Sequence, residues 1–215
     1  MAYSITGDFQ KPTLSELLEL LRKVRGHETG WPPWLVFARE EIAPYAYNGV
    51  IECWLVESRF VDAVHSDFWR ASRGGMMFLL RGYDEDSSPN QVQPGTILDL
   101  TLPIWRIGEC LLHAERLATA IAGQSASLTF RVIWSGLLGR TLTAWANPRR
   151  TLFPGRRSRQ DSVTSEIDTS VSRVSANLPE IVRSLTIPLY EIFDFFTPSP
   201  KMIQEELSEM RKMRV

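Results

Sequence analysis

The chain of 215 residues is 44% hydrophobic and 23% charged, a composition typical of a globular protein with a sizeable core. Its formal net charge of -1 excludes an overall attraction to nucleic acid or anionic membranes, so such binding would need a local patch. No apolar run reaches the length of a membrane span, and the first residues lack the pattern of a signal peptide. We therefore expect a cytoplasmic protein without membrane contacts.

The first half of the chain is predicted to combine one amphipathic helix with several strands. Thr13 and Glu16 have the spacing of a capping box, and the leucines that follow predict a helix over 13–24. Two prolines in the segment HETGWPPW exclude regular structure over 27–34, so this aromatic segment either plugs the core or roofs a pocket. Alternating and β-forming residues predict strands at 50–57, 76–82 and 96–102.

The second half begins with the strongest helical pattern of the chain. Pro103 at the first position and a continuous apolar face predict a helix over 103–122. The residues SGLLG link two β-forming runs, which predicts a hairpin of strands at 127–134 and 140–145. Further elements are predicted as a strand at 163–174 and helices at 178–196 and 199–213.

These elements predict an α+β fold, in which a mainly antiparallel sheet is covered by long helices in a single compact domain with a C-terminal helical appendage. Residues 1–148 form the core, 149–162 an exposed Arg-rich connector, and 163–215 a strand and two helices that complete the same domain. Ile203, Leu207 and Met210 line one side of the last helix. This stripe suits docking on the body of the protein or a homodimer through the helix.

The two cysteines, Cys53 and Cys110, lie in apolar runs and have no partner at metal-ligand spacing. This pattern predicts buried, reduced thiols, so we expect neither a metal nor a cofactor.

The densest group of polar and aromatic residues is HSDFWRASRGGMMFLLRGYDED at 65–86. Arginine forks beside aromatic rings can bind a carboxylate or phosphate. On the helix over 103–122, spacings of three and four place a second polar stripe on one side. We predict a ligand-binding cleft in which Arg70, Arg81 and Arg106 converge, although the same residues could instead brace the fold. The candidate ligand-binding residues are Asp67, Trp69, Arg70, Arg81, Arg106, Glu109 and His113.

Two other functions compete with this interpretation. The chain contains no nucleophile elbow, phosphate-binding loop or metal-protease motif, so we expect binding more than catalysis. A hydrolase or nuclease-like enzyme would use His65, Asp67, Glu109 and His113 as acid–base or metal-binding groups. Nucleic acid could be bound by the basic run 149–159, although that run has no interleaved aromatic residues. Its arginines are Arg149, Arg150, Arg156, Arg157 and Arg159.

Several motifs together resemble the C-terminal region of bacterial putative transcriptional regulators that carry an N-terminal Schlafen AlbA_2-type domain. They are ETGWPPW, HSDFWRAS, FLLRGYDEDS, PGTILDLTLPIWRIGECLLHAERLA, WSGLLGR and LYEIFDFF, and the resemblance covers about residues 12 to 213. No AlbA_2-type segment is recognisable in this chain, so DNA binding does not carry over.

The resemblance implies a companion domain that senses a ligand, recruits a partner or oligomerises. We accordingly expect a non-catalytic sensor or interaction domain of a regulatory or defence-type protein. Its polar-aromatic cleft would bind a small anionic molecule or a protein segment.

Overall fold

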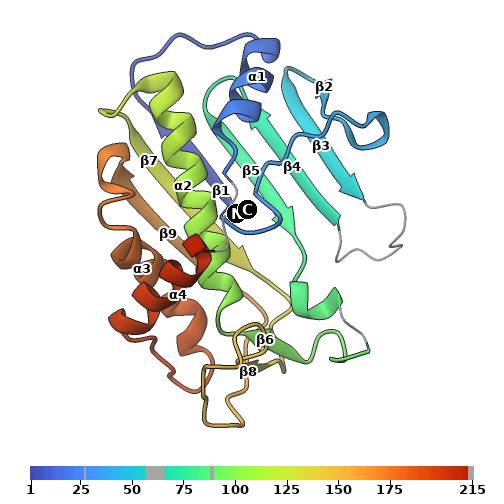
Figure 1. Ribbon diagram of the computed structural model, residues 1–215, viewed down its shortest axis with the longest axis vertical. Helices are drawn as coiled ribbons and strands as arrows, with labels where there is room; N and C mark the ends of the chain where they lie inside the picture. The colour runs from blue at the N-terminus through green and yellow to red at the C-terminus, as the bar shows by residue number, and fades with distance from the viewer. Residues whose placement is uncertain (27, 57–65, 88–89, 213–215) are drawn as a thin grey trace.

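A seven-stranded antiparallel sheet organises the protein (Figure 1). The computed structural model describes residues 1–26, 28–56, 66–87 and 90–212. The strand order is β2-β3-β4-β5-β1-β7-β9. The strands are β1 (Ala2–Thr6), β2 (Tyr45–Tyr47), β3 (Val50–Val56), β4 (Ser66–Ser72), β5 (Met76–Arg81), β7 (Ser127–Trp134) and β9 (Val163–Ser170). A separate pair, β6 (Ile97–Asp99) and β8 (Thr141–Thr143), is parallel.

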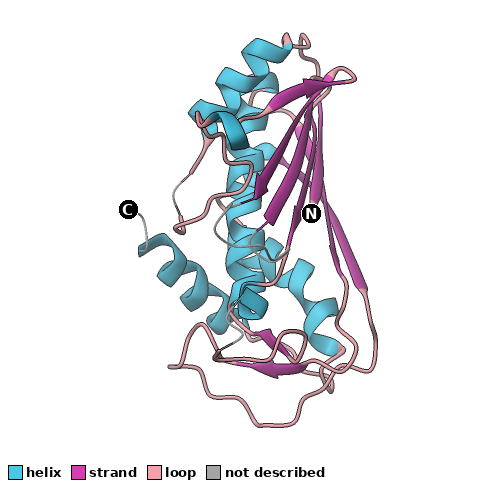
Figure 2. Cartoon of the chain, turned by 90° about the vertical axis from the view of Figure 1, so that its right-hand side faces the viewer, coloured by secondary structure: helices cyan, strands magenta, loops and turns pink. Residues whose placement is uncertain are grey.

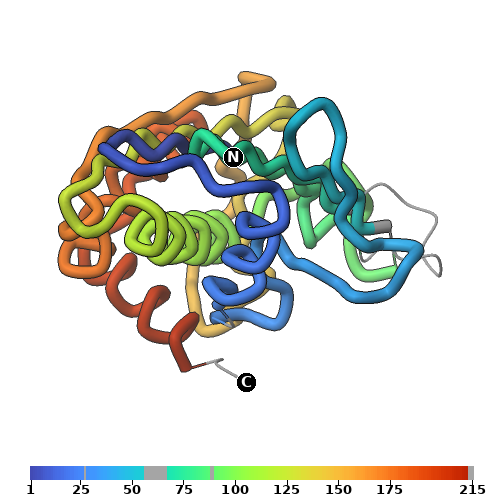
Figure 3. The backbone as a smooth tube through the Cα atoms, turned by 90° about the horizontal axis from the view of Figure 1, so that it is seen from above, coloured from blue at the N-terminus to red at the C-terminus, as the bar shows by residue number. Residues whose placement is uncertain are grey.

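Four α-helices lie on one side of this sheet, so the predicted α+β fold with a mainly antiparallel sheet is confirmed. Figure 2 shows the sheet edge-on with the helices against one face, and Figure 3 shows α2 end-on beneath it. The helices are α1 (Leu14–Val24), α2 (Leu102–Ala122), α3 (Leu178–Glu191) and α4 (Pro200–Lys212). Short 3-10 turns are η1 (Glu40–Ile42), η3 (Asp84–Ser87) and η4 (Val171–Arg173). Within the described residues, no helix is both long and apolar enough to cross a membrane.

The core forms where the alternating apolar side chains of the strands meet the helices. Tyr3 and Ile5 of β1 point to this side, as do Phe130 of β7 and Leu79 of β5. Burying such side chains is the main favourable contribution to folding, at about 25 cal/mol per Å² of apolar surface. Both cysteines are free and buried, as the sequence predicts.

Strand β1 lies in the centre of the sheet, although the sequence analysis predicts no strand there. It pairs with β5 and β7, and Ala2 lies opposite Phe78 and Arg131. From these partners β5 continues to Arg81 and β7 to Trp134. The two neighbours of β1 therefore run past it, and a gap opens between their ends.

The predicted hairpin of strands 127–134 and 140–145 is wrong. Strand β7 pairs with β1 and β9, whereas β8 pairs with β6. The glycines of SGLLG do adopt positive φ, at 71° for Gly136 and 82° for Gly139. They turn the chain away from the main sheet, because the edge of β7 that a hairpin would need is occupied by β9.

The predicted strand over 96–102 is shorter than expected, because Asp99 starts a helix. Its buried carboxylate accepts hydrogen bonds from the backbone N–H groups of Thr101 (2.7 Å) and Leu102 (2.8 Å). These donors belong to the first turn of α2, whose N–H groups have no partner within the helix. The other oxygen accepts from Ala146 N at 2.8 Å, so one side chain joins α2 to the segment after β8.

Helix α4 docks on the body of the protein through its predicted apolar stripe. Ile203, Leu207 and Met210 are buried, and a Cβ at Gly108 of α2 would lie 2.8 Å from Leu207 Cδ2. Glycine at this position lets the two helices approach closely. Since the stripe packs within the chain, it is not exposed for the predicted homodimer through this helix.

Replacing Asp99 should destabilise the fold strongly. Asp99→Ala leaves one buried and two partly buried N–H groups without their acceptor, and each orphaned buried group costs about 1–3 kcal/mol. We expect a loss of at least about 3 kcal/mol in the free energy of unfolding, measured with urea. Asp99→Asn keeps one acceptor oxygen and should lose less, and the exposed Asp8→Ala should be nearly neutral. A loss below about 1 kcal/mol for Asp99→Ala would contradict this role.

Candidate functional site

A buried ion pair joins the ends of β4 and β5. Asp67 and Arg81 lie directly opposite each other in the sheet, and Arg81 Nε donates to Asp67 Oδ1 at 2.9 Å. Both side chains are almost completely buried. Trp31 Nε1 donates to the same carboxylate at 2.8 Å. The predicted site residues Asp67 and Arg81 therefore come together, but as partners of each other.

Arg106 of α2 forms a second set of contacts beside this pair. It pairs with Glu109 (3.2 Å) one helical turn further on and with Asp84 of η3. Its Nη1 also donates to Thr29 Oγ1 at 3.3 Å, and the Thr29 hydroxyl donates to Glu109. Burial raises the pKa of Glu109, while the positive charge of Arg106 opposes the rise.

The two arginines meet at one backbone oxygen. Arg81 Nη1 and Arg106 Nη1 each donate to the carbonyl of Trp31 at 3.3 Å, and Arg81 Nη2 donates to the carbonyl of Pro32 at 3.4 Å. The segment around the two prolines has no regular hydrogen-bonding ladder of its own. The guanidinium groups fix it against the sheet and α2, so both cations are already satisfied within the protein.

Arg70 does not join Arg81 and Arg106, so the predicted convergence of all three is wrong. Side chains of a strand alternate between its faces, and Arg70 lies on the face opposite Asp67. There it pairs with Glu52 at 2.5 Å and lies over the Phe68 ring at 5.5 Å. Trp69 points to the helical side, where it is fully buried and donates to Leu35 O at 3.1 Å.

His113 lies deeper in the core than the other predicted site residues. Its ring stacks on Trp34 with centroids 4.7 Å apart, and Nδ1 lies 3.1 Å from the Tyr3 hydroxyl. Burial lowers the pKa of His113 to about 3, so the ring is neutral at physiological pH. Its Nε2 has no hydrogen-bond partner in the part of the chain that the structure describes.

These positions give little support to the enzyme hypothesis. Asp67 and Glu109 are engaged by arginines, His113 is enclosed by aromatic rings, and His65 lies outside the described residues. Across 1–26, 28–56, 66–87 and 90–212, no group of three or more His, Cys, Asp or Glu side chains could hold a metal ion.

Three of the five arginines in the basic run 149–159 are bound to the rest of the chain. Arg150 pairs with Glu205 at 2.8 Å and with Glu206. Arg156 donates to Asp194 O, and Arg157 Nε donates to Gly139 O, each at 2.8 Å. The charge of Arg150 is therefore balanced within the chain, whereas Arg156 and Arg157 use part of their hydrogen-bonding capacity on backbone carbonyls.

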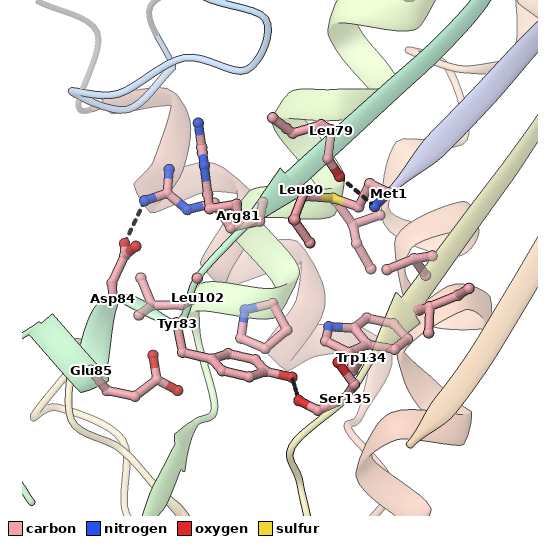
Figure 4. A pocket seen from close by; sticks show the side chains of 16 residues that line it. Met1, Leu79, Leu80, Arg81, Tyr83, Asp84, Glu85, Leu102, Trp134 and Ser135 are labelled. Atoms are coloured by element: carbon pink, nitrogen blue, oxygen red, sulfur yellow. Dashed lines mark hydrogen bonds and ion pairs between the residues drawn. The ribbon is translucent and has the colours of Figure 1, made fainter. Parts of the chain in front are cut away.

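A cleft lies between the ends of β5 and β7, where β1 is missing (Figure 4), and Arg81 and Arg106 of the predicted site line it, whereas Asp67, Trp69, Arg70, Glu109 and His113 do not. Its volume is about 280 Å³. Apolar side chains of β5, β7 and α2 form most of its lining. These are Met1, Leu79, Leu80, Leu102, Pro103, Ile107, Val132, Ile133 and Trp134. The polar lining comes from Arg81, Tyr83, Asp84, Glu85, Arg106 and Ser135.

Glu85 of η3 is the unusual polar group in this cleft. Its side chain lines the cavity although the residue is only 1% exposed, and Oε1 accepts a hydrogen bond from Asp99 N at 2.9 Å. Burial raises the pKa of Glu85 to about 7, and the carboxylates of Asp99 and Asp84 add to the rise. Among the described residues, neither Lys nor Arg forms a salt bridge with it.

Tyr83 connects the two strand ends at the cleft. Its hydroxyl donates to Ser135 O at 2.9 Å, as Figure 4 shows. The guanidinium of Arg140 lies 4.5 Å from the centre of the Tyr83 ring and pairs with Asp86. The acidic run YDED at the end of β5 marks this region in the sequence. Nothing in the sequence shows which of its carboxylates is buried.

No family model, no curated protein and no solved structure matches the chain.

Removing one partner of the Asp67–Arg81 pair should be costly. Asp67→Ala leaves the buried Arg81 guanidinium without its counter-charge and the Trp31 indole N–H without its acceptor, and breaking a buried ion pair costs about 3–5 kcal/mol. Replacing both partners by apolar side chains, as in Asp67→Leu with Arg81→Met, should recover much of that loss. Urea unfolding of the single and double variants tests this, and a double variant as unstable as Asp67→Ala would contradict it.

The buried His113 should make the fold sensitive to acid. The folded pKa of about 3 lies below the ordinary value near 6.5, so the unfolded chain binds the proton first. The contribution to stability is complete above about pH 6.5 and is lost as pH falls through 3, by roughly 5 kcal/mol in all. The difference in unfolding free energy between the wild type and His113→Phe, followed from pH 7 to pH 4, should show this slope. A difference in unfolding free energy that stays constant between pH 7 and pH 4 would contradict this contribution of His113.

Proposed function

We propose that the chain is a non-catalytic binding domain whose cleft between β5 and β7 receives a small apolar molecule that carries an amine. The observation behind this proposal is that Glu85 lines a mostly apolar cleft without a salt-bridge partner among the described residues, whereas both arginines at the cleft are already paired.

The size and lining of the cleft agree with a small ligand. Binding sites for small molecules are largely apolar, with a few polar groups that orient the ligand, and occupy about 300–1,000 Å³. At about 280 Å³ the cleft lies just below the lower end of this range, which suits a ligand of few atoms. Leu80, Ile133 and Trp134 would contact the apolar part of the ligand, and Glu85 its charged end.

The charges around the cleft favour a cationic group over the anion that the sequence analysis predicts. Arg81 is engaged by Asp67, and Arg106 by Asp84 and Glu109. An anion would have to displace one of these carboxylates and would also lie near Glu85. An ammonium group would instead supply a counter-charge to a buried carboxylate, and such charge-assisted hydrogen bonds are among the strong ones.

The resemblance to regulators, which no comparison tests, would explain why the domain binds a small molecule. In that setting the domain would sense an amine-bearing molecule for a companion domain. The acid–base candidates of the sequence analysis are held in internal contacts, so binding without chemistry is the better-supported role.

A matched set of benzyl compounds tests the ligand chemistry. Benzylamine should shift the backbone NMR resonances of residues around Glu85 and raise the melting temperature, whereas benzyl alcohol should act more weakly and benzoate not at all. The affinity for benzylamine should rise from about pH 6 to about pH 8, because the amine stays protonated while Glu85 loses its proton. Glu85→Gln should bind benzylamine at least about tenfold more weakly.

The exposed Glu40→Gln is the matched control and should bind as the wild type does. Benzoate binding at the cleft would favour an anionic ligand instead. Unchanged benzylamine binding by Glu85→Gln would exclude the proposed role of this carboxylate.

A further inference from the structure

In the part of the chain that the structure describes, no helix covers the face of the sheet that points away from α1 to α4. All four α-helices lie on one side, as Figures 2 and 3 show. Strand alternation places residues on the open side in rows that cross the sheet. One row runs through Trp54, Phe68 and Leu80, which are register partners on β3, β4 and β5. The next runs through Arg70 and Phe78.

The part of this face over β2 to β5 is strongly apolar. Trp54 and Phe68 lie with ring centroids 5.5 Å apart, and Phe68 and Phe78 with centroids 6.3 Å apart. The exposed fractions of its large side chains range from 41% to 64%. They are Tyr45 48%, Tyr47 52%, Trp54 52%, Met76 64%, Phe78 41% and Leu80 59%. Trp54, Phe68, Phe78 and Leu80 form the centre of this surface, and the Glu52–Arg70 pair lies between them and the tyrosines of β2. We call these side chains together the open apolar face.

The open apolar face has the size expected of an interface. A large aromatic side chain carries about 150–250 Å² of surface, so these half-exposed chains present on the order of 500 Å². The largest apolar patch of a typical monomer is about 300–600 Å² and is often functional. A standard interface covers about 800 Å² per partner, of which roughly 60% is non-polar. The apolar area of the open apolar face agrees with the patch area, and this face together with its polar margin agrees with the interface area.

The charges on this side of the sheet favour a partner of mixed charge. Arg70 is neutralised by Glu52, and Arg131 lies 3.8 Å from Glu166. Asp168 accepts a hydrogen bond from the Thr129 hydroxyl. The strands thus present two arginines and three carboxylates here, so a polyanion such as nucleic acid would meet no excess of positive charge.

We propose that the open apolar face binds the same face of a second copy of this chain. Two sheets pack face to face about 10 Å apart with their strands nearly aligned. A twofold axis near β4 places the apolar half of each copy on that of the other, while the mixed charges of β7 and β9 lie at the margin. A hollow of about 540 Å³ beside Met76 and Phe78 leaves room for side chains of the second copy.

This surface is separable from the ligand cleft. Leu80 belongs to both, but Trp54, Phe68 and Phe78 do not line the cleft. Substitutions at these three positions therefore test the interface and leave the proposed amine site in place.

Sedimentation of the full chain over a wide concentration range tests the proposal. The wild type should be dimeric at high micromolar concentration, and Trp54→Glu with Phe78→Glu should raise the dimer Kd at least a hundredfold. Both positions are about half exposed, so circular dichroism and the urea midpoint should change little. Phe153→Glu, at an 83% exposed position outside the sheet, is the matched control and should still dimerise.

Three outcomes would overturn the proposal. They are a monomeric wild type at all concentrations, a double variant that dimerises as the wild type does, and single-stranded oligonucleotide binding that needs Trp54 and Phe78 in a monomeric chain. The last would identify a nucleic-acid surface instead. Benzylamine binding, measured on the same samples, reports on the cleft separately, so failure of one proposal does not imply failure of the other.

Discussion

The carbonyl oxygen of Trp31 links the sheet to α2, because the guanidinium groups of Arg81 and Arg106 both donate to it. Arg81 belongs to the sheet, Arg106 to α2, and Trp31 to a segment in which two prolines preclude a hydrogen-bonding ladder. Since buried backbone carbonyls need donors, this segment can be held against the core only by groups from elsewhere. The arginines supply those donors, and the carboxylates of Asp67, Asp84 and Glu109 balance their charge.

This arrangement also determines which charged groups of the neighbouring cleft are left to bind a ligand. With both arginines engaged, Glu85 is a charged group of the cleft that has no salt-bridge partner among the described residues. It is held at low exposure by η3 and by the N–H of Asp99. Asp99 at the same time starts α2. The residues that build the helix and those that line the cleft are therefore one connected set. Ligand binding at Glu85 would be coupled to the start of the longest helix.

The sheet has two unlike faces. On the helical side, Trp69, Leu79 and Phe130 are fully buried, whereas the other side leaves Trp54 and Phe78 about half exposed. A sheet with one covered face normally carries polar residues on its free face. The aromatic residues on the free face of β3 to β5 depart from that pattern. The departure is greatest in one half of the sheet, since β7 and β9 carry mainly charged and hydroxyl side chains there, with Ile133 of β7 as a 54% exposed exception.

The sequence by itself determined the elements with strong local signals. The capping box of Thr13 and Glu16 and the apolar faces of α1, α2 and α4 follow from periodicity, and so does the alternation of β3 and β7. Which polar residues pair with one another depends on the tertiary structure. The alternation of side chains along β4 places Arg70 and Asp67 on opposite faces of the sheet, but it does not show which face the helices cover. Likewise, β1 between β5 and β7, and the cleft beyond it, depend on pairing between strands far apart in the chain. Periodicity along the chain shows which residues share one side of a helix or strand. Strand order, register and burial arise instead from contacts between elements, which periodicity does not contain.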